Sequence, residues 1–523
     1  MSHTPAQPDT STETDASAAS PFVEVDTHAG RVRGQWRPTT RHAGDASGGR
    51  GAERSAAFLG LPFAEAPVGE LRFAAPVPKA PWAGVRDALE FAPTAQRGDP
   101  GVTLIPEPSI EGDSTLNVNV FTPSPERPAD GAEGLPVLVW IHGGGYFAGS
   151  PASPWYDGRN FNRDGVVTVT ISYRLGFDGF GWIDGAPSNR GIRDWLLALE
   201  WVQQNIAAFG GDPARVTIAG QSAGGGAVLT LLGMEAAQRL FHGVYAISGA
   251  TADVTPERAE ALARRIAAQL GVEPTLAGFS SVSEERLLDA QKAATALDPS
   301  ALNEVLDEGL GLGPTIDGEL LHRSTVDSLA AGVGAGKPLV LGATDDEFAM
   351  ALMDAPKILR FVPKSMLVKK SGLTKAQVRP YLAANRDVSK HGNARLLGRL
   401  ITDRMFKVPM LRVVAARARL DDAAGTWLYR FAWPSGTFGF AEHCLDVPFF
   451  FDCLDGPAMV PLAGPNPPQA LADELHAGAV AFVATGDPGE AWPRWSDASR
   501  ATRVYDTPTT VADDGYASVR PLL

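Results

Sequence analysis

A serine between two glycines is the first feature of this chain that could do chemistry. In residues 216–228, VTIAGQSAGGGAV, the four strand-like residues VTIA are followed directly by GQSAG, with Ser222 at its centre. Glycines weaken any regular element, but they allow a sharp turn that holds the Ser222 hydroxyl above the end of a sheet. This pattern is that of a G-x-S-x-G nucleophile elbow. The alternative is an ordinary glycine-rich turn, since so short a motif also occurs by chance.

A serine hydroxyl needs a base, and the base usually needs a carboxylate to orient it. Five histidines follow Ser222: His242, His322, His391, His443 and His476. His443 lies in the loop GTFGFAEHCLDVPFF, directly after a predicted strand, from which it could reach over the sheet edge. We therefore predict His443 as the base and place the other four on surfaces or helix faces.

Candidate acids follow another predicted strand, in LGATDDEFAM. Asp345, Asp346 and Glu347 are adjacent there, and one of the three could face His443. The alternative is that all three belong to a solvated loop or a helix start.

A second glycine-rich segment, VWIHGGGYFAG at residues 139–149, follows a buried strand pattern. Successive glycines let backbone N–H groups approach a reacting oxygen, and an HGGG loop of this kind forms an oxyanion hole in esterases. A phosphate-binding loop is the alternative, but neither G-x-x-x-x-G-K-[ST] nor G-x-G-x-x-G with its acidic partner is present.

The elements that must position these groups alternate between strand and helix. Short β-branched runs predict buried strands at residues 135–141, 166–172, 216–219, 338–344 and 426–433. A helix is predicted within residues 189–210, which gives a strand–helix–strand unit and a mostly parallel sheet. Further helices are predicted at residues 255–271, 283–296 and 393–406, as a helical insertion between late strands.

The composition of the chain limits the classes of binding partner that we expect. The chain has 523 residues and a formal net charge of -14, with no long cluster of lysine and arginine. These features argue against nucleic acid and anionic membrane surfaces as partners. Residues 1–20 have neither a basic region nor an apolar core, so we expect a disordered tail and not a secretory signal. Residues 21–523 are expected to form a single domain.

Cysteine is sparse. Cys444 and Cys453 are the two cysteines of the chain, which fits a reducing cytoplasm. A bridge between them remains an alternative.

The chain resembles the type B carboxylesterases, the family of the cholinesterases and bacterial para-nitrobenzyl esterases, from about Gly30 onward. The resemblance is carried by GLPFAEAPVGELRFAAPVP, ISYRLGFDGFG, NIAAFGGDPARVTIAGQSAGG and AFVATGDPGEAWPRW. It implies an α/β-hydrolase fold with a mostly parallel central sheet, flanking helices and a helical insertion. It also implies hydrolysis of small-molecule carboxylic esters through an acyl-enzyme, without a metal or organic cofactor, by a monomer or small homo-oligomer.

The resemblance also implies roles for single residues. Ser222 matches the family nucleophile, Glu347 the acid and His443 the base. The remaining matches are Gly144, Gly145 and Ala223 as oxyanion-hole N–H donors, Ser248 as a hydrogen-bond partner of the acid, and Arg174 with Asp194 as a structural ion pair.

Some positions depart from the family pattern. Gln221 stands where a glutamate often precedes the nucleophile, Trp195 stands where glutamine is common, and Thr94 and Thr115 stand where the family has a bridged pair of cysteines. The segment from Thr94 to Thr115 contains no aromatic residue, so we expect neutral aryl or alkyl esters to be preferred to cationic ones. Apolar contacts would come from Tyr146, Phe147 and Phe438.

Two other functions were weighed. The same groups would serve a carbamate or amide hydrolase. A non-catalytic binding protein of the same fold, like the neuroligins, would be expected to lack the nucleophile and to be a secreted, disulfide-bearing domain, and this sequence shows neither feature.

Overall fold

The computed structural model describes residues 20–40, 52–101, 104–126, 129, 133–249, 251–296 and 302–523. The tail predicted for residues 1–20 therefore lies almost entirely outside the described part. Within that part, no helix combines the length and the apolar character that a membrane-spanning segment requires.

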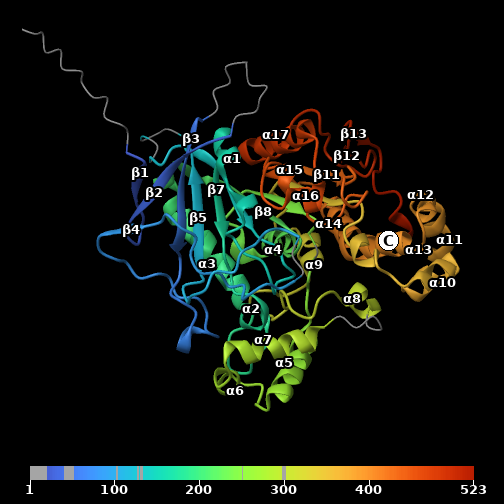
Figure 1. The fold of residues 1–523 in the computed structure, drawn as a ribbon, viewed down its shortest axis with the longest axis horizontal. Coiled ribbons are helices and arrows are strands. Elements are labelled where there is room, and N and C mark those ends of the chain that lie inside the picture. Colours follow the sequence, from blue (N-terminus) through green and yellow to red (C-terminus); the bar gives the residue numbers. More distant parts are fainter. Residues whose placement is uncertain are drawn as a thin grey trace, which may run out of the picture.

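One large twisted sheet organises the chain (Figure 1). Its strands follow the order β1-β2-β3-β5-β7-β6-β8-β9-β10-β11-β12-β13, with β4 paired to β2. The strands are β1 Phe22–Asp26, β2 Arg31–Pro38, β3 Arg54–Pro62, β4 Val85–Asp87, β5 Asn117–Thr122, β6 Leu135–Ile141, β7 Val167–Ile171, β8 Gly211–Gln221, β9 Gly243–Ile247, β10 Leu339–Thr344, β11 Thr426–Phe431, β12 Thr502–Tyr505 and β13 Thr510–Ala512. All neighbouring pairs from β7 to β12 are parallel, which confirms the predicted mostly parallel sheet.

Helices cover both faces of the sheet and also form two segments inserted between its strands (Figure 1). They are α1 Arg159–Arg163, α2 Gly176–Phe180, α3 Arg190–Asn205, α4 Ala223–Leu232, α5 Pro256–Leu270, α6 Leu276–Ser280, α7 Glu284–Thr295, α8 Leu302–Glu308, α9 Thr325–Ala330, α10 Lys364–Lys370, α11 Lys375–Ala384, α12 Arg386–Lys390, α13 Asn393–Thr402, α14 Val408–Arg417, α15 Val447–Phe450, α16 Met459–Ala463 and α17 Gln469–Thr485.

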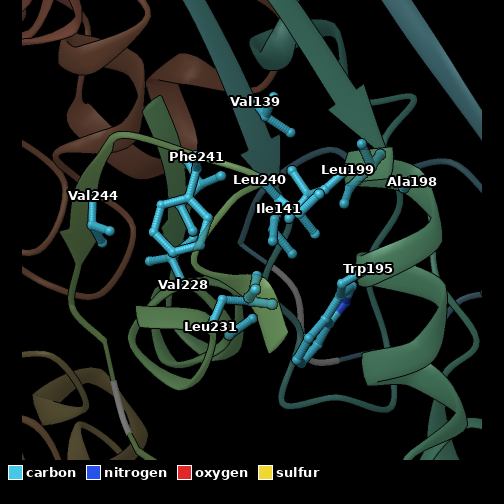
Figure 2. Packing of buried hydrophobic residues seen from close by; sticks show 14 of the residues in the cluster. Val139, Ile141, Trp195, Ala198, Leu199, Val228, Leu231, Leu240, Phe241 and Val244 are labelled. Atoms are coloured by element: carbon cyan, nitrogen blue, oxygen red, sulfur yellow. The ribbon is translucent and has the colours of Figure 1, made fainter. Parts of the chain in front are cut away.

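Side chains of the central strands alternate between the two faces of the sheet and build a hydrophobic core on each. Val137, Val139 and Ile141 of β6 pack with α3 and α4, whereas Leu138 and Trp140 of the same strand pack with α15 and α17. Successive side chains of a strand point to opposite faces, so a strand buried on both sides reads as a continuous apolar run. Figure 2 shows the first of these cores, in which the fully buried Trp195 of α3 faces Ile141 and Leu231.

The helical insertion is confirmed, but it consists of two segments. Helices α5–α9 lie between β9 and β10, and α10–α14 lie between β10 and β11. The first segment begins as predicted, with the Thr255 hydroxyl accepting from the N–H of Arg258 and with Gly271 ending α5 at φ 71°. The helix predicted at residues 393–406 is α13, which continues as a π-helical turn, η8 (Asp403–Lys407).

Candidate functional site

Ser222 occupies a strained turn between a strand and a helix. Strand β8 ends at Gln221, α4 begins at Ala223, and Ser222 between them has φ 58° and ψ -121°. A Cβ atom on Gly220 would lie 2.5 Å from the carbonyl carbon of Gly224, and one on Gly224 would lie 2.0 Å from the carbonyl oxygen of Ile141. Both glycines are therefore required by the close approach of backbone segments, which explains why the motif has this form.

Other strained residues gather around Ser222. Tyr146, Ser248 and Cys444 have φ values of 65°, 46° and 67°, a region that side-chain-bearing residues rarely adopt. Each such backbone conformation raises the free energy of the fold by about 1–3 kcal/mol, so it persists only where the surrounding structure holds it in place. Their concentration around one turn marks this end of the sheet as a functional site.

Glu347 is the acidic residue that contacts His443. Its Oε2 atom hydrogen-bonds Nδ1 of the imidazole, and its backbone carbonyl accepts a bond of 3.0 Å from the N–H of His443. Its Oε1 atom accepts from the Ser248 hydroxyl at 2.6 Å and from the N–H of Thr344 at 2.8 Å. The carboxylate is fully buried, so these donors fix its position completely.

The two neighbouring aspartates are engaged elsewhere. The Asp345 carboxylate accepts from Arg430 at 2.8 Å. The Asp346 carboxylate accepts from Arg395 at 2.7 Å and from Arg399 at 2.9 Å. Of the three adjacent acids, Glu347 is thus the one that faces the imidazole.

The other nitrogen of His443 is contacted by Gln221. The Gln221 Nε2 atom lies 3.1 Å from Nε2 of the imidazole, and no hydrogen bond joins Ser222 Oγ to His443, both of which belong to the described part. The rings of Phe348 and Phe406 flank the imidazole with centroids 5.0 and 5.2 Å away. The sequence did not indicate these two phenylalanines, although Phe348 directly follows the acid.

The electrostatic surroundings of His443 favour its charged form. Burial opposes a charge on the imidazole, but the Glu347 carboxylate, with the Cys444 sulfur as a hydrogen-bond partner, raises the pKa of His443 well above its usual range. Burial raises the pKa of the Cys444 thiol, which keeps it neutral. Burial also raises the pKa of Glu442 to about 9, so this carboxyl group is protonated at neutral pH. Glu347 therefore supplies the negative charge beside the imidazole.

The HGGG segment forms a tight loop beside Ser222. Gly144 and Gly145 have φ values of 98° and 61°, and a Cβ atom on Gly144 would lie 2.1 Å from the carbonyl oxygen of Ala148. Among the described residues, the N–H groups of Gly144 and Gly145 donate to no acceptor. Ala223 is the first residue of α4, where an N–H group has no partner within the helix. All three residues line one cavity with Ser222.

That cavity has a volume of about 1450 Å³ and is mostly apolar. Ser222, His443 and the two glycines line it, and its walls also come from both helical segments. A second cavity of about 820 Å³ adjoins it and shares Gly145 and Phe147 with it.

The expected aromatic contacts are only partly present. Tyr146 and Phe147 line the cavity, Tyr146 as a core residue that packs on Phe180. Phe438 does not line it and instead packs against Phe440, so that prediction is wrong. Phe348 and Phe406 line the cavity and supply the rings.

The segment from Thr94 to Thr115 also reaches the cavity. It contributes Leu104, Ile105 and Glu107 and no aromatic ring. The Glu107 carboxylate accepts from the Tyr156 hydroxyl at 2.7 Å, and burial raises its pKa to about 7. The sequence analysis did not single out this carboxyl group, which no local motif marks.

Other predictions concern residues away from the cavity. The ion pair of Arg174 with Asp194 is present, with a separation of 2.8 Å, and is buried. Cys444 and Cys453 are both free thiols. His476 is buried on α17 and contacts the Phe450 carbonyl and Asp164, whereas His322 and His391 are exposed.

Comparisons with known proteins identify the family and the fold of the chain. A sequence model described as the carboxylesterase family matches residues 20–518. The chain is similar to a para-nitrobenzyl esterase of Bacillus subtilis, with 32% identity over 483 residues that cover 89% of this chain and 94% of the relative. It is also similar to a liver carboxylesterase of Sus scrofa, with 32% identity over 521 residues that cover 91% and 88% of the two chains.

A solved structure shows the same fold. The chain superposes on a carboxylesterase of Geobacillus stearothermophilus with a TM-score of 0.78 and 31% identity, over 95% of this chain and 99% of the other. The fold is therefore that of an α/β-hydrolase. The chain belongs to the carboxylesterase family and is a carboxylic ester hydrolase.

Proposed function

We propose that Ser222, His443 and Glu347 hydrolyse carboxylic esters through an acyl-enzyme. The observation that carries this proposal is the set of four hydrogen bonds made by Glu347, which hold one carboxylate oxygen on Nδ1 of His443. With Nδ1 protonated, Nε2 presents a lone pair and can accept the proton of the Ser222 hydroxyl. The Glu347 charge then stabilises the imidazolium that forms.

Attack of Ser222 on the ester carbonyl produces an oxyanion. The N–H groups of Gly144, Gly145 and Ala223 are suited to bind it, because they line the cavity beside Ser222 and lack competing acceptors. In comparable sites the loss of one such donor raises the barrier by about 2.7–4 kcal/mol. Collapse of the intermediate expels the alcohol, which receives its proton from His443.

Water completes the cycle. The neutral His443 takes a proton from a water molecule as it attacks the acyl-Ser222 carbonyl, and the second oxyanion uses the same N–H groups. In the free enzyme the Gln221 amide contacts Nε2. The amide must move from this position when Nε2 engages the Ser222 hydroxyl or the water.

The substrates that we propose are neutral aryl or alkyl esters. The mostly apolar cavity is suited to them, and Gln221 places an uncharged amide where a carboxylate would attract cations. The same groups would attack a carbamate or amide carbonyl. Single-turnover rates for a matched aryl ester and aryl carbamate distinguish these substrates.

We also infer the cellular context from the sequence. Two free thiols fit a reducing cytoplasm, and the net charge of -14 disfavours nucleic acid as a partner. We infer that residues 21–523 act as one α/β-hydrolase unit on small-molecule esters, as a monomer or small homo-oligomer.

Trapping the acyl-enzyme tests the mechanism. The protein is quenched in acid during turnover of a slowly deacylated aryl ester, and its peptides are analysed by mass spectrometry. We expect one acyl group on the peptide that contains Ser222, and none in Ser222→Ala. The variant Ser496→Ala, in an exposed loop, is a matched control that keeps the adduct. An acyl group on any other residue would refute the assignment.

A further inference from the structure

The segment from Lys357 to Arg379 carries a charge opposite to that of the whole chain. It contains Lys357, Arg360, Lys364, Lys369, Lys370, Lys375 and Arg379 and no acidic residue, whereas the chain as a whole has a net charge of -14. All seven cationic side chains are exposed. Within the described part of the chain, none of them forms an ion pair.

Large apolar side chains are exposed in the same region. Ile358 and Phe361 are 74% and 71% exposed, and Met353 and Met366 are also exposed. Arg360 holds its guanidinium 4.6 Å from the centroid of the Phe361 ring. We call these four apolar and seven basic residues the basic apolar face. Isolated apolar residues on a surface are ordinary, but four of them interleaved with unpaired cations form an amphipathic surface.

The face is held together by the helix beneath it. The short 3-10 helix η7 (Lys357–Phe361) and helix α10 both pack on α13, and α10 also packs on α11. Asn393 of α13 donates to the carbonyls of Leu359 and Val362 at 2.8 and 2.7 Å. Figure 1 shows α10 and α11 at the outer edge of the molecule, at the right of the view. Both parts of the face are therefore supported by α13.

The same elements form a wall of the catalytic cavity. Leu367 of α10 belongs to a small hydrophobic cluster with Leu397 and Ile401, against which Phe348 and Leu352 pack. Ile401, Phe348 and Leu352 line the cavity, as do Gly372, Leu373 and Gln377 of the segment itself. The basic apolar face is thus the outer side of a wall whose inner side contacts the cavity.

We propose that the basic apolar face docks this esterase on anionic phospholipid bilayers. Lysine and arginine near such a surface strengthen binding by about fivefold each, and apolar side chains that enter the headgroup region add to this. A nucleic acid would use the cations but not the exposed Ile358 and Phe361, and an acidic protein would not require cations spread over two helices and a turn. Lipophilic esters dissolved in the bilayer would then lie close to the cavity.

The average charge of the chain does not oppose this docking. The net charge of the whole chain predicts no binding to anionic membranes. Charges farther away than about 10 Å, however, are largely screened at 0.1 M salt. One exposed carboxylate, Asp354, lies between Met353 and Lys357, and the seven local cations outweigh its single charge. We therefore propose peripheral binding of this face to anionic bilayers, in place of the prediction that the protein has no membrane partner.

Vesicle flotation of the full chain tests the proposal, with and without phosphatidylglycerol in phosphatidylcholine vesicles. We expect binding to anionic vesicles at least tenfold stronger than to neutral ones, falling steeply between about 0.1 and 0.5 M NaCl. Lys369→Gln with Lys370→Gln should weaken binding about 25-fold. Ile358→Ser with Phe361→Ser should weaken it about tenfold or more. Ser222→Ala should bind like the unaltered protein, which separates docking from the proposed catalytic mechanism.

Matched variants control for charge and apolar area. Arg239→Gln with Arg494→Gln makes the same change in net charge on other surfaces, and Val460→Ser removes another exposed apolar residue; both should bind normally. Every variant of the face should hydrolyse a soluble short-chain ester at the unaltered rate, which shows that it is folded. Equal binding to neutral and anionic vesicles, or equal loss in the control pair, would overturn the proposal. So would unchanged vesicle binding in the Ile358/Phe361 variant together with competition by single-stranded DNA, which would indicate a nucleic-acid surface.

Discussion

At the scale of single residues, the Glu347 carboxylate contacts the imidazole of His443, whereas those of Asp345 and Asp346 contact arginines. We expect Glu347→Gln to lower kcat/KM for an aryl ester by about 10⁴-fold, because an amide at this position no longer fixes the imidazole tautomer or stabilises its charge. The measurement is steady-state kinetics on a purified variant whose melting temperature is checked.

Asp345→Asn and Asp346→Asn are the matched controls for that prediction. Each breaks an ion pair with arginine and should lower the melting temperature while leaving kcat/KM within about tenfold of normal. A loss of 10⁴-fold in either of them, with Glu347→Gln nearly unaffected, would show that the acid has been misassigned.

The pH dependence of turnover reports the charge beside His443. The base must be neutral to accept a proton, and the pKa of His443 is raised, so activity is lost as the pH falls through that raised value. We expect kcat/KM to rise with pH with an apparent pKa above 6.5, the ordinary value for histidine. Glu347→Gln should lower this apparent pKa, because it removes the carboxylate that favours the imidazolium.

Gln221→Glu should shift the same profile in the opposite direction. It places a carboxylate where an amide now lies 3.1 Å from Nε2, which raises the apparent pKa further. Gln204→Glu, on the exposed face of α3, makes the same charge change away from the site and should leave the profile unchanged. An apparent pKa at or below 6.5 in the unaltered enzyme would contradict the role given to Glu347.

At the scale of elements, we expect the segment from Thr94 to Thr115 to set the preference between neutral and cationic esters. It brings aliphatic residues and Glu107 to the cavity but no ring that could hold a quaternary ammonium. A desolvated cation–π contact contributes about 2 kcal/mol. We therefore expect butyrylcholine to lack this gain of about thirtyfold, and its kcat/KM to be lower than that of an uncharged carbon isostere at low pH.

The carboxyl group of Glu107 should make this ratio depend on pH. Its pKa is about 7, so it is neutral below that pH and negatively charged above it. The preference for the neutral ester should shrink as the pH rises through about 7, and Glu107→Gln should remove this change. The dependence on His443 is common to both substrates and cancels in the ratio. A preference for butyrylcholine at low pH would refute the prediction.

Local patterns at the element scale were sufficient for five strands of the sheet (β6, β7, β8, β10 and β11) and for the turn at Ser222, but not for the other strands. The strands predicted at residues 135–141 and 338–344 are β6 and β10, because buried parallel strands need continuous apolar residues and little else. The placement of Phe438 failed, and the contact of Gln221 with His443 was not foreseen. The first depends on the path of a loop and the second on the orientation of a side-chain amide. Neither leaves a periodic signal in the sequence.

At the scale of the whole molecule, the positions of the thiols bear on redox behaviour. Cys444 lies beside the base and Cys453 donates a weak bond of 3.7 Å to the Trp155 carbonyl. Burial raises the pKa of both thiols, so neither is an active thiolate at neutral pH. Where the type B family has a bridged cysteine pair, the structure instead has a side-chain bridge. The Asn117 amide donates to the carbonyls of Pro93 and Ser114, next to Thr94 and Thr115, at 2.9 and 3.1 Å.

We therefore expect dithiothreitol to change neither ester turnover nor the melting temperature, since the described chain has no disulfide to reduce. Asn117→Ala should lower the free energy of unfolding by about 1–3 kcal/mol, because it leaves two partly buried carbonyl groups without their donor. Its melting temperature should fall equally with and without reductant. Calorimetry and an aryl ester assay, each run in the presence and absence of dithiothreitol, provide the measurement. Loss of activity or a lower melting temperature with dithiothreitol in the unaltered protein would reveal a Cys444–Cys453 bridge and contradict the reduced state described here.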